Sequence, residues 1–278
     1  KTGLTLTEGS TYYVSVRATD TDSQVSDTTI TDGITIDTDA PVISEVIEGV
    51  GVPIVTDIDG NVYQTVEIGD QLWMKENLKV THYNNGDVIP TAYSGEDWAN
   101  LSTGAYAVYD DDESNADTYG YLYNWYAVDT INLAPEGWHV PTDDEWTELT
   151  DYLGGDAGSQ LAGNADLWND YTNGEGIEDN SEFGTSGFDG LPGGYRNDSN
   201  GNCNNMGISA PFWSSTETSD LSALLRGLGF SNSEVERSSN YKSYGFGVRL
   251  IRDIDYLTIS DADFQNEASS LAIHWSGS

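Results

Sequence analysis

The stretch WHVPTDDEWTELTDYLGG, residues 138–155, carries a complete helix start and a complete helix stop. Thr142 stands where a cap is needed, and Glu145 follows at the spacing of a capping box. Apolar side chains then recur at helical spacing and predict one buried face: Trp146, Leu149, Tyr152 and Leu153. Gly154 and Gly155 end the pattern. We therefore expect a helix over residues 142–153 that supports the core of a central domain, with its acids serving the cap and the helix dipole.

The composition excludes several classes of partner. The 278 residues carry 10 Lys and Arg against 47 Asp and Glu, a formal net charge of −37. Nucleic acid phosphates and anionic membrane surfaces would be repelled, so we expect neither as a partner. No apolar run approaches the roughly 20 residues of a membrane-spanning helix, so membrane insertion is not expected. Hydrophobic residues still make up 37%, with 8 Trp and 17 Tyr, enough to bury a substantial core.

The two ends of the sequence are predicted to be all-β. Residues 11–20, TYYVSVRATD, alternate with the period of a half-buried strand. Residues 1–41 resemble the last strands of an immunoglobulin-like or fibronectin type III-like domain, and residues 42–56 form a linker. Residues 254–278 resemble the first strands of a further domain of that type, with an alternating set formed by Leu271, Ile273 and Trp275.

Both end pieces lack the middle strands of such a sandwich, and three explanations stay open. The chain is a single repeat cut from a long tandem array, or the tail of one copy pairs with the head of the next by strand addition, or the boundaries of the chain are arbitrary. The first two explanations imply an end-to-end assembly of copies, a homo-polymer joined through the terminal β segments.

Five ordered motifs between the two ends resemble one bacterial family. They are YLYNW at 121–125, GWHVPTDDEW at 137–146, SGFDGLPGGYR at 186–196, FWSSTE at 212–217 and GFGVRLIRD at 245–253. Together they are similar to the Fibrobacter succinogenes major paralogous domain, over residues 57–253. That family occurs in secreted and surface proteins, so the resemblance implies a secreted or bacterial cell-surface location.

A second resemblance concerns the fold. The helix stretch and the GFGVR ending are similar to formylglycine-generating-enzyme-like domains, which have the C-type-lectin-like fold. This likeness implies an α+β, C-type-lectin-like architecture for residues 57–253. The oxidase activity of those enzymes is not expected, because it needs a pair of reactive cysteines and the chain has only Cys203. Leu250 stands where a cysteine is frequent in the paralogous domain.

No catalytic motif stands out, so we do not expect an enzyme. The sequence lacks the signatures of a nucleophile elbow, a phosphate-binding loop and a dinucleotide-binding loop. His82, His139 and His274 are far apart and show no metal-ligand spacing. A carboxylate pair for glycoside hydrolysis has no distinguishing mark among 47 acids. Four arginines are interpreted as structural partners of loop carboxylates: Arg196, Arg226, Arg249 and Arg252.

Calcium is the one cofactor that the sequence suggests, since this hard cation binds clustered carboxylates on loops. Three acidic stretches supply the candidate ligands Asp20, Asp22, Asp27, Asp37, Asp39, Asp57 and Asp59. The alternative is that these acids are solvated turn residues. If calcium is bound, a chelator should lower the midpoint of thermal unfolding, and an unchanged midpoint would remove the idea.

Aromatic-rich loops offer a second kind of site. Tyr121, Trp125 and Trp168 are candidates for stacking on sugar rings, although large aromatics in a turn-rich domain equally serve as core. Two functions follow from these features. The first is an extracellular repeat unit that assembles end to end into a surface fibre or stalk. The second is an adhesin or carbohydrate-binding module displayed on a β-sandwich spacer.

Overall fold

The structure is a computed structural model that describes residues 11–18, 29–30, 34–35, 54–130, 132–171, 176–253 and 270–275. Contacts between residues divide the chain into two units. The terminal unit comprises residues 1–49 and 255–278, and the central unit comprises residues 50–254.

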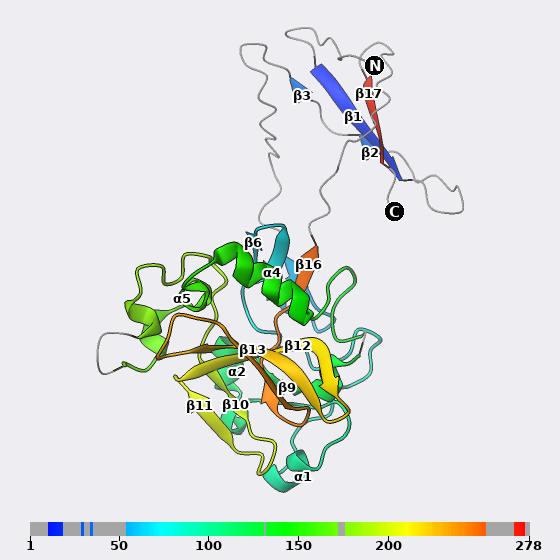
Figure 1. The fold of residues 1–278 in the computed structure, drawn as a ribbon. Helices are drawn as coiled ribbons and strands as arrows, with labels where there is room; N and C mark the ends of the chain where they lie inside the picture. Colours follow the sequence, from blue (N-terminus) through cyan, green and yellow to red (C-terminus); the bar gives the residue numbers. More distant parts are fainter. Residues whose placement is uncertain are drawn as a thin grey trace. The chain divides into compact units, whose positions relative to one another are not determined.

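The terminal unit joins strands from both ends of the sequence (Figure 1). β1 (Thr11–Ala18) and β17 (Ser270–Trp275) pair in parallel. β2 (Thr29–Ile30) and β3 (Ile34–Thr35) each pair with β1 in antiparallel orientation. The strands that the alternating patterns predict at the two ends are therefore confirmed.

The central unit is built from short antiparallel sheets. In chain order, its described strands are β4 (Val55–Thr56), β5 (Val62–Tyr63), β6 (Thr65–Ile68), β7 (Gln71–Met74), β8 (Tyr106–Ala107), β9 (Leu122–Asn124), β10 (Gly193–Arg196), β11 (Cys203–Met206), β12 (Ser209–Ser219), β13 (Ser222–Gly229), β14 (Glu236–Tyr241), β15 (Gly245–Phe246) and β16 (Ile251–Asp253). One sheet has the order β11-β10-β15-β9-β8, another β12-β13-β14, and a third β16-β7-β6, while β4 pairs with β5. Strands distant in the sequence thus become neighbours, as β7 and β16 do.

Short helices fill the connections between these strands. They are α1 (Gly95–Ala99), α2 (Ser114–Tyr119), α3 (Trp125–Val128), α4 (Asp143–Leu153) and α5 (Ala157–Leu161), with 3₁₀ turns η1 (Tyr109–Asp111), η2 (Ala165–Leu167) and η3 (Ile177–Asp179). α4 contacts β12 and β13 (Figure 1). Within the described residues, no helix has the length and apolar character that crossing a membrane requires.

The expected α+β, C-type-lectin-like fold is wrong, because the central unit is β-rich. Apart from α4 with 11 residues, the α-helices have only 4 to 6 residues. The composition agrees with this outcome, since Gly, Ser and Asn favour turns and Thr favours strands over helix interiors. A well-formed helix at one place in the sequence therefore did not indicate helices elsewhere.

The helix α4 has the predicted cap and the predicted end. The Thr142 hydroxyl accepts a hydrogen bond from the Glu145 N–H at 3.2 Å, and Glu145 Oε2 accepts one from the Thr142 N–H at 2.6 Å, so the capping box is confirmed. Gly154 ends the helix with φ of 73°, in the left-handed region that favours glycine. Trp146 and Leu149 are buried as expected. Tyr152, predicted for the same face, is 66% exposed, so that expectation is wrong.

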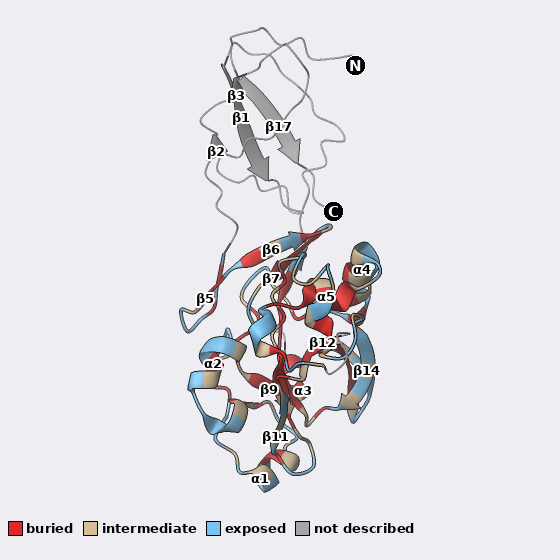
Figure 2. Ribbon diagram, turned by 90° about the vertical axis from the view of Figure 1, so that its left-hand side faces the viewer, coloured by how far each residue is buried: buried red, intermediate tan, exposed pale blue. Residues whose placement is uncertain are grey.

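Tryptophan and phenylalanine rings form the part of the core beneath α4. Trp146 lies against Trp73, with ring centroids 4.8 Å apart, and against Phe212 at 5.7 Å. Phe188 meets Trp73 edge-on at 5.6 Å. Buried residues follow β7 and β9 through the interior, whereas α2 and β14 are largely exposed (Figure 2). Four segments distant in sequence thus meet in one aromatic cluster.

Candidate functional sites

Two of the three aromatics predicted to stack on sugars lie in the core. Trp125 is 1% exposed, its Nε1–H donates to the Ser214 carbonyl at 2.9 Å, and the Lys242 ammonium lies 4.5 Å from its ring centre. Trp168 is also buried, and its Nε1–H donates to the Gly163 carbonyl at 3.1 Å. The rings of these two residues are therefore enclosed by protein.

Tyr121 is the third predicted aromatic and is only half-buried. Its ring packs on Tyr106, with centroids 4.6 Å apart, and its hydroxyl donates to Glu113 Oε2 at 3.3 Å. Burial, followed by the charge of Glu113, raises the pKa of Tyr121 to about 12. The hydroxyl thus stays protonated, and the ring belongs to a stacked tyrosine pair.

The candidate calcium ligands Asp57 and Asp59 both serve as hydrogen-bond acceptors, Asp57 mainly within its own turn and Asp59 toward the segment at Thr81 and His82. Asp57 accepts the N–H groups of Asp59 at 3.0 Å and Asn61 at 2.9 Å, and the Tyr63 hydroxyl at 2.6 Å. Asp59 accepts the Thr81 hydroxyl at 2.9 Å and lies 2.6 Å from His82 Nδ1. Asp57 is 6% exposed, so it is not a solvated turn acid, and both carboxylates are satisfied by hydrogen bonds within the protein.

No trio of His, Cys, Asp or Glu side chains suited to a metal ion occurs within the described residues. The other candidate ligands, Asp20, Asp22, Asp27, Asp37 and Asp39, lie outside those residues. Calcium binding by these acids therefore stays a prediction.

Cys203 is half-buried on β11, opposite Arg196 of β10. Its sulfur accepts a hydrogen bond from the Asp110 N–H at 3.3 Å, and burial raises the pKa of the thiol. A raised pKa keeps the thiol protonated at neutral pH, which is the opposite of an activated cysteine nucleophile.

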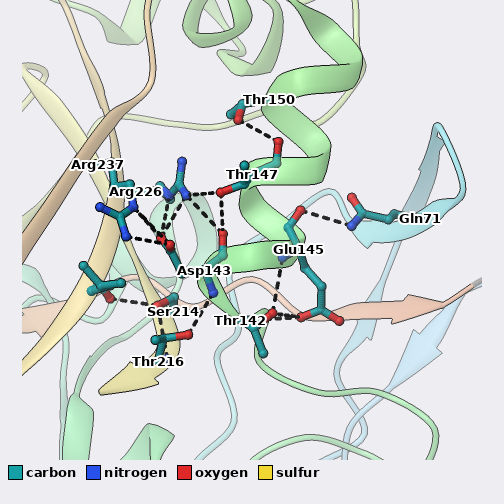
Figure 3. Close-up of polar contacts among 11 residues, drawn as sticks. Gln71, Thr142, Asp143, Glu145, Thr147, Thr150, Ser214, Thr216, Arg226 and Arg237 are labelled. Atoms are coloured by element: carbon teal, nitrogen blue, oxygen red, sulfur yellow. Dashed lines mark hydrogen bonds and ion pairs between the residues drawn. The ribbon is translucent and has the colours of Figure 1, made fainter. Parts of the chain in front are cut away.

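An ion cluster at the start of α4, buried at Asp143 and Arg226 and exposed at Arg237, holds the helix to the β12-β13-β14 sheet (Figure 3). Asp143 Oδ1 accepts the Arg226 Nη2–H at 2.8 Å and the Nε–H at 3.1 Å, and the Arg237 Nη2 lies 2.9 Å from Oδ2. Arg226 also donates to the Thr147 hydroxyl at 2.7 Å. Burial is the largest influence on Asp143 and raises its pKa, but the hydrogen bonds and charges of Arg237 and Arg226 outweigh it and lower the pKa.

Two of the four arginines predicted to pair with loop acids have other principal contacts. Arg196 lies over the Trp98 ring at 4.6 Å and approaches Asp111 only at 3.6 Å. Arg249 donates to backbone carbonyls instead of a carboxylate. Arg226 does pair with a carboxylate, although Asp143 belongs to α4 and not to a loop, and the prediction is wrong for Arg249.

A cavity of about 290 Å³ opens where α3 ends and the lead-in to α4 begins. We call it the Trp138 cavity. Its lining combines apolar Val128, Ala134 and Val140 with Trp138, His139, Asp129, Thr130 and Ser215. Trp138 is half-buried and Asp129 is exposed, so an aromatic ring and a carboxylate both reach the opening.

The Trp138 cavity has a rigid wall. The N–H and carbonyl of His139 pair with those of Ile251 at 3.0 Å each, and the Ser215 N–H donates to the Pro141 carbonyl at 2.8 Å. The His139 ring is fixed by Glu145, since Nε2 lies 2.6 Å from Oε1. An aromatic surface beside a few fixed polar groups is the usual composition of a small-molecule site.

A second cavity, of about 330 Å³, is lined in part by the residues that directly follow β7. We call it the Arg249 cavity. Its lining is polar except for Leu191, and it includes the charged side chains of Lys75, Glu76, Asp189 and Arg249. The sequence patterns predicted neither cavity, because the walls come from segments that only the fold brings together.

This fold and these sites define a class of protein, a β-rich domain with an aromatic core, one mixed cavity and one polar cavity. The chain belongs to the family described as the Fibrobacter succinogenes major domain, whose family model matches residues 66–252. The resemblance read from the five motifs is thereby confirmed. Neither the curated proteins nor the solved structures contain a match to the chain.

Proposed function

We propose that the chain is an extracellular structural repeat unit that assembles end to end through its terminal β segments. The observation that carries this proposal is the parallel ladder between β1 and β17, in which Tyr13 lies opposite Ser270 and Ala18 opposite Trp275. The two strands come from opposite ends of the sequence. If β17 of one copy takes this place beside β1 of another, the copies join head to tail, as in strand addition and open-ended domain swapping.

The charge of the chain favours a directional contact over lateral association. A net charge of −37 makes copies repel one another, and salt screens that repulsion. A backbone ladder, by contrast, needs no complementary charge. Calcium bound by the acids at positions 20–39 would reduce the same repulsion, so a chelator would weaken the assembly while added salt would strengthen it.

Ile273→Pro is expected to abolish the assembly. Ile273 pairs with Val16 in the middle of the ladder, and proline removes a backbone N–H that a ladder uses. Light scattering of the full chain at increasing protein and salt concentration measures the effect, and electron microscopy shows the product. Ser278→Pro, outside β17, is the matched control and should assemble like the wild type. A wild-type chain that stays monomeric at high concentration would contradict the proposal.

A second candidate function, a carbohydrate-binding module or adhesin, is favoured by the Trp138 cavity. Sugar rings present C–H faces to aromatic rings and hydroxyls to groups such as Asp129 and Thr130. A glycan array with the full chain tests this function. Trp138→Ala should weaken any bound glycan about tenfold, the equivalent of about 1.4 kcal/mol. Tyr152→Ala, which removes an exposed ring elsewhere, is the control, and equal losses in both variants would count against the cavity.

A further inference from the structure

The Arg249 cavity contains a buried positive charge that no carboxylate of the described residues contacts. Arg249 is 1% exposed. Its guanidinium donates to the carbonyls of Met74 at 3.0 Å, Phe188 at 2.5 Å and Asp189 at 2.8 Å, and to Asn77 Oδ1 at 2.6 Å. These acceptors are neutral, so within the described part of the chain the hydrogen bonds leave the charge itself without a contacting anion. Burial lowers the pKa of Arg249 to about 9, which reflects the cost of keeping the charge there.

A negative charge without an ion-pair partner among the described residues lines the same cavity. Glu76 is exposed, and one of its carboxylate oxygens accepts the Gln64 N–H at 2.9 Å. Its charge acts on Arg249, yet among the described residues no ion pair within 4.0 Å joins the two side chains. Lys75 and Asp189, the other charged residues of the wall, already pair with each other at 2.9 Å. The cavity therefore separates one cation from one anion.

Two residues of the wall adopt a backbone conformation that is rare for residues other than glycine. Asn164 has φ of 48° and Asp189 has φ of 55°. Such residues cost up to about 1–3 kcal/mol each, although Asn and Asp tolerate the conformation best, and they concentrate at ligand clamps. The Asp189 carbonyl that this conformation presents is one of the acceptors of Arg249. The wall thus fixes the guanidinium in place before any ligand arrives.

The distribution of charge selects the chemistry of the ligand. A simple anion would be attracted by Arg249 and repelled by Glu76. A simple cation would be attracted by Glu76 and repelled by Arg249. A molecule with both charges satisfies both groups. The volume of about 330 Å³ lies at the low end of ligand pockets, roughly 300–1,000 Å³, and so suits one small molecule.

We propose that the Arg249 cavity binds a free α-amino acid, with the carboxylate of the ligand directed at Arg249 and its ammonium group at Glu76. Thr118 lies in the wall as a further polar residue, and Leu191 offers a small apolar surface to the ligand side chain. The proposal is independent of the end-to-end assembly and of glycan binding at Trp138, because it uses a different cavity.

Isothermal titration of the full chain with L-serine, acetate, ethylamine and glucose tests the proposal. L-Serine should bind saturably at one site, and acetate and ethylamine should bind at least tenfold more weakly because each satisfies only one charge. Glu76→Gln keeps an oxygen that can accept the Gln64 N–H and removes the charge, so it should weaken L-serine about tenfold without weakening acetate. Glu148→Gln, at an exposed position of α4, is the matched control and should bind L-serine like the wild type.

Several outcomes would overturn the proposal. Acetate binding as tightly as L-serine would define a plain anion site, and glucose binding in preference to L-serine would define a polyol site. Absence of saturable L-serine binding, or a Glu76→Gln variant that binds like the wild type, would also overturn it. Because Glu76 is exposed, this variant should keep the thermal midpoint of the wild type, and that midpoint is measured alongside. Glu76→Gln therefore decides the question without Arg249→Lys, a change to a buried side chain that puts folding itself at risk.

Discussion

Asp143→Ala is expected to lower the free energy of unfolding by about 3–5 kcal/mol, because it leaves a buried arginine without its anion. Arg226 is 4% exposed and Asp143 is 7% exposed. Arg226 would keep its bonds to the carbonyl of residue 143, at 3.0 Å, and to the Thr147 hydroxyl, at 2.7 Å, but neither carries a charge. Urea unfolding at neutral pH measures the loss.

The same carboxylate predicts how the effect depends on pH. The pKa of Asp143 is lowered in the folded chain, so its contribution to stability is complete above the ordinary aspartate pKa of about 3.9 and is lost as pH falls through the lower folded value. The difference in stability between Asp143→Ala and the wild type should therefore shrink below about pH 4. A difference that stays constant down to pH 2 would show that the charge is not the cause.

Asp144→Ala is the matched control for Asp143→Ala. Asp144 is the next residue in the first turn of α4 and is exposed, so its carboxylate acts mainly on the helix dipole. Its removal should cost only about 0.3–1 kcal/mol. Equal losses for Asp143→Ala and Asp144→Ala would contradict the role assigned to the buried cluster.

Trp146→Ala should cost about 3–5 kcal/mol, because it opens a cavity in the aromatic core beneath α4. Trp146 is 1% exposed, and its ring is within 6 Å of three others, with centroid distances of 4.8 Å to Trp73, 5.8 Å to Phe188 and 5.7 Å to Phe212. Tyr152→Ala, on the same helix, should cost less than about 0.5 kcal/mol, since that side chain is 66% exposed. Denaturant unfolding of the two variants gives the comparison.

Trp146→Phe separates packing from polarity at this position. The Trp146 Nε1–H is buried and has no hydrogen-bond partner among the described residues. Phenylalanine removes this unpaired donor, which stabilises the fold. It fills most but not all of the indole volume, which destabilises the fold, so the two effects partly cancel. The cost should stay below about 1.5 kcal/mol. A loss as large as that of Trp146→Ala would show that the full indole is needed for packing.

The local chemistry of α4 made it predictable, whereas the fold class was not. A cap, an apolar period and a terminal glycine all act within a few residues, so the pattern at 138–155 located the helix and its ends. The lectin-like architecture was inferred from two motifs that are compatible with more than one arrangement of strands. The sheets depend on pairings such as β7 with β16, which no local pattern specifies.

The candidate sites, like the fold class, could not be predicted from local patterns. Trp125 and Trp168 stood out as aromatics in loops, and the structure encloses both. Trp138 belonged to the stretch that located the helix, but its exposure at a cavity mouth depends on α3 and on Ser215. Nothing in the sequence distinguished Glu76 among 47 acids, and only the structure places it at the same cavity as Arg249.

The sequence by itself determined the helix at 143–153, the strands near both ends of the sequence, the family and the lack of a cysteine pair. Only the tertiary structure decided which rings are buried, which acid neutralises Arg226 and which groups surround Arg249. The physical reason is distance along the chain. Capping and periodicity act over one or two turns, whereas Asp143 and Arg226 are 83 positions apart and Asn77 and Arg249 are 172 positions apart. Burial and charge pairing are properties of the packed chain.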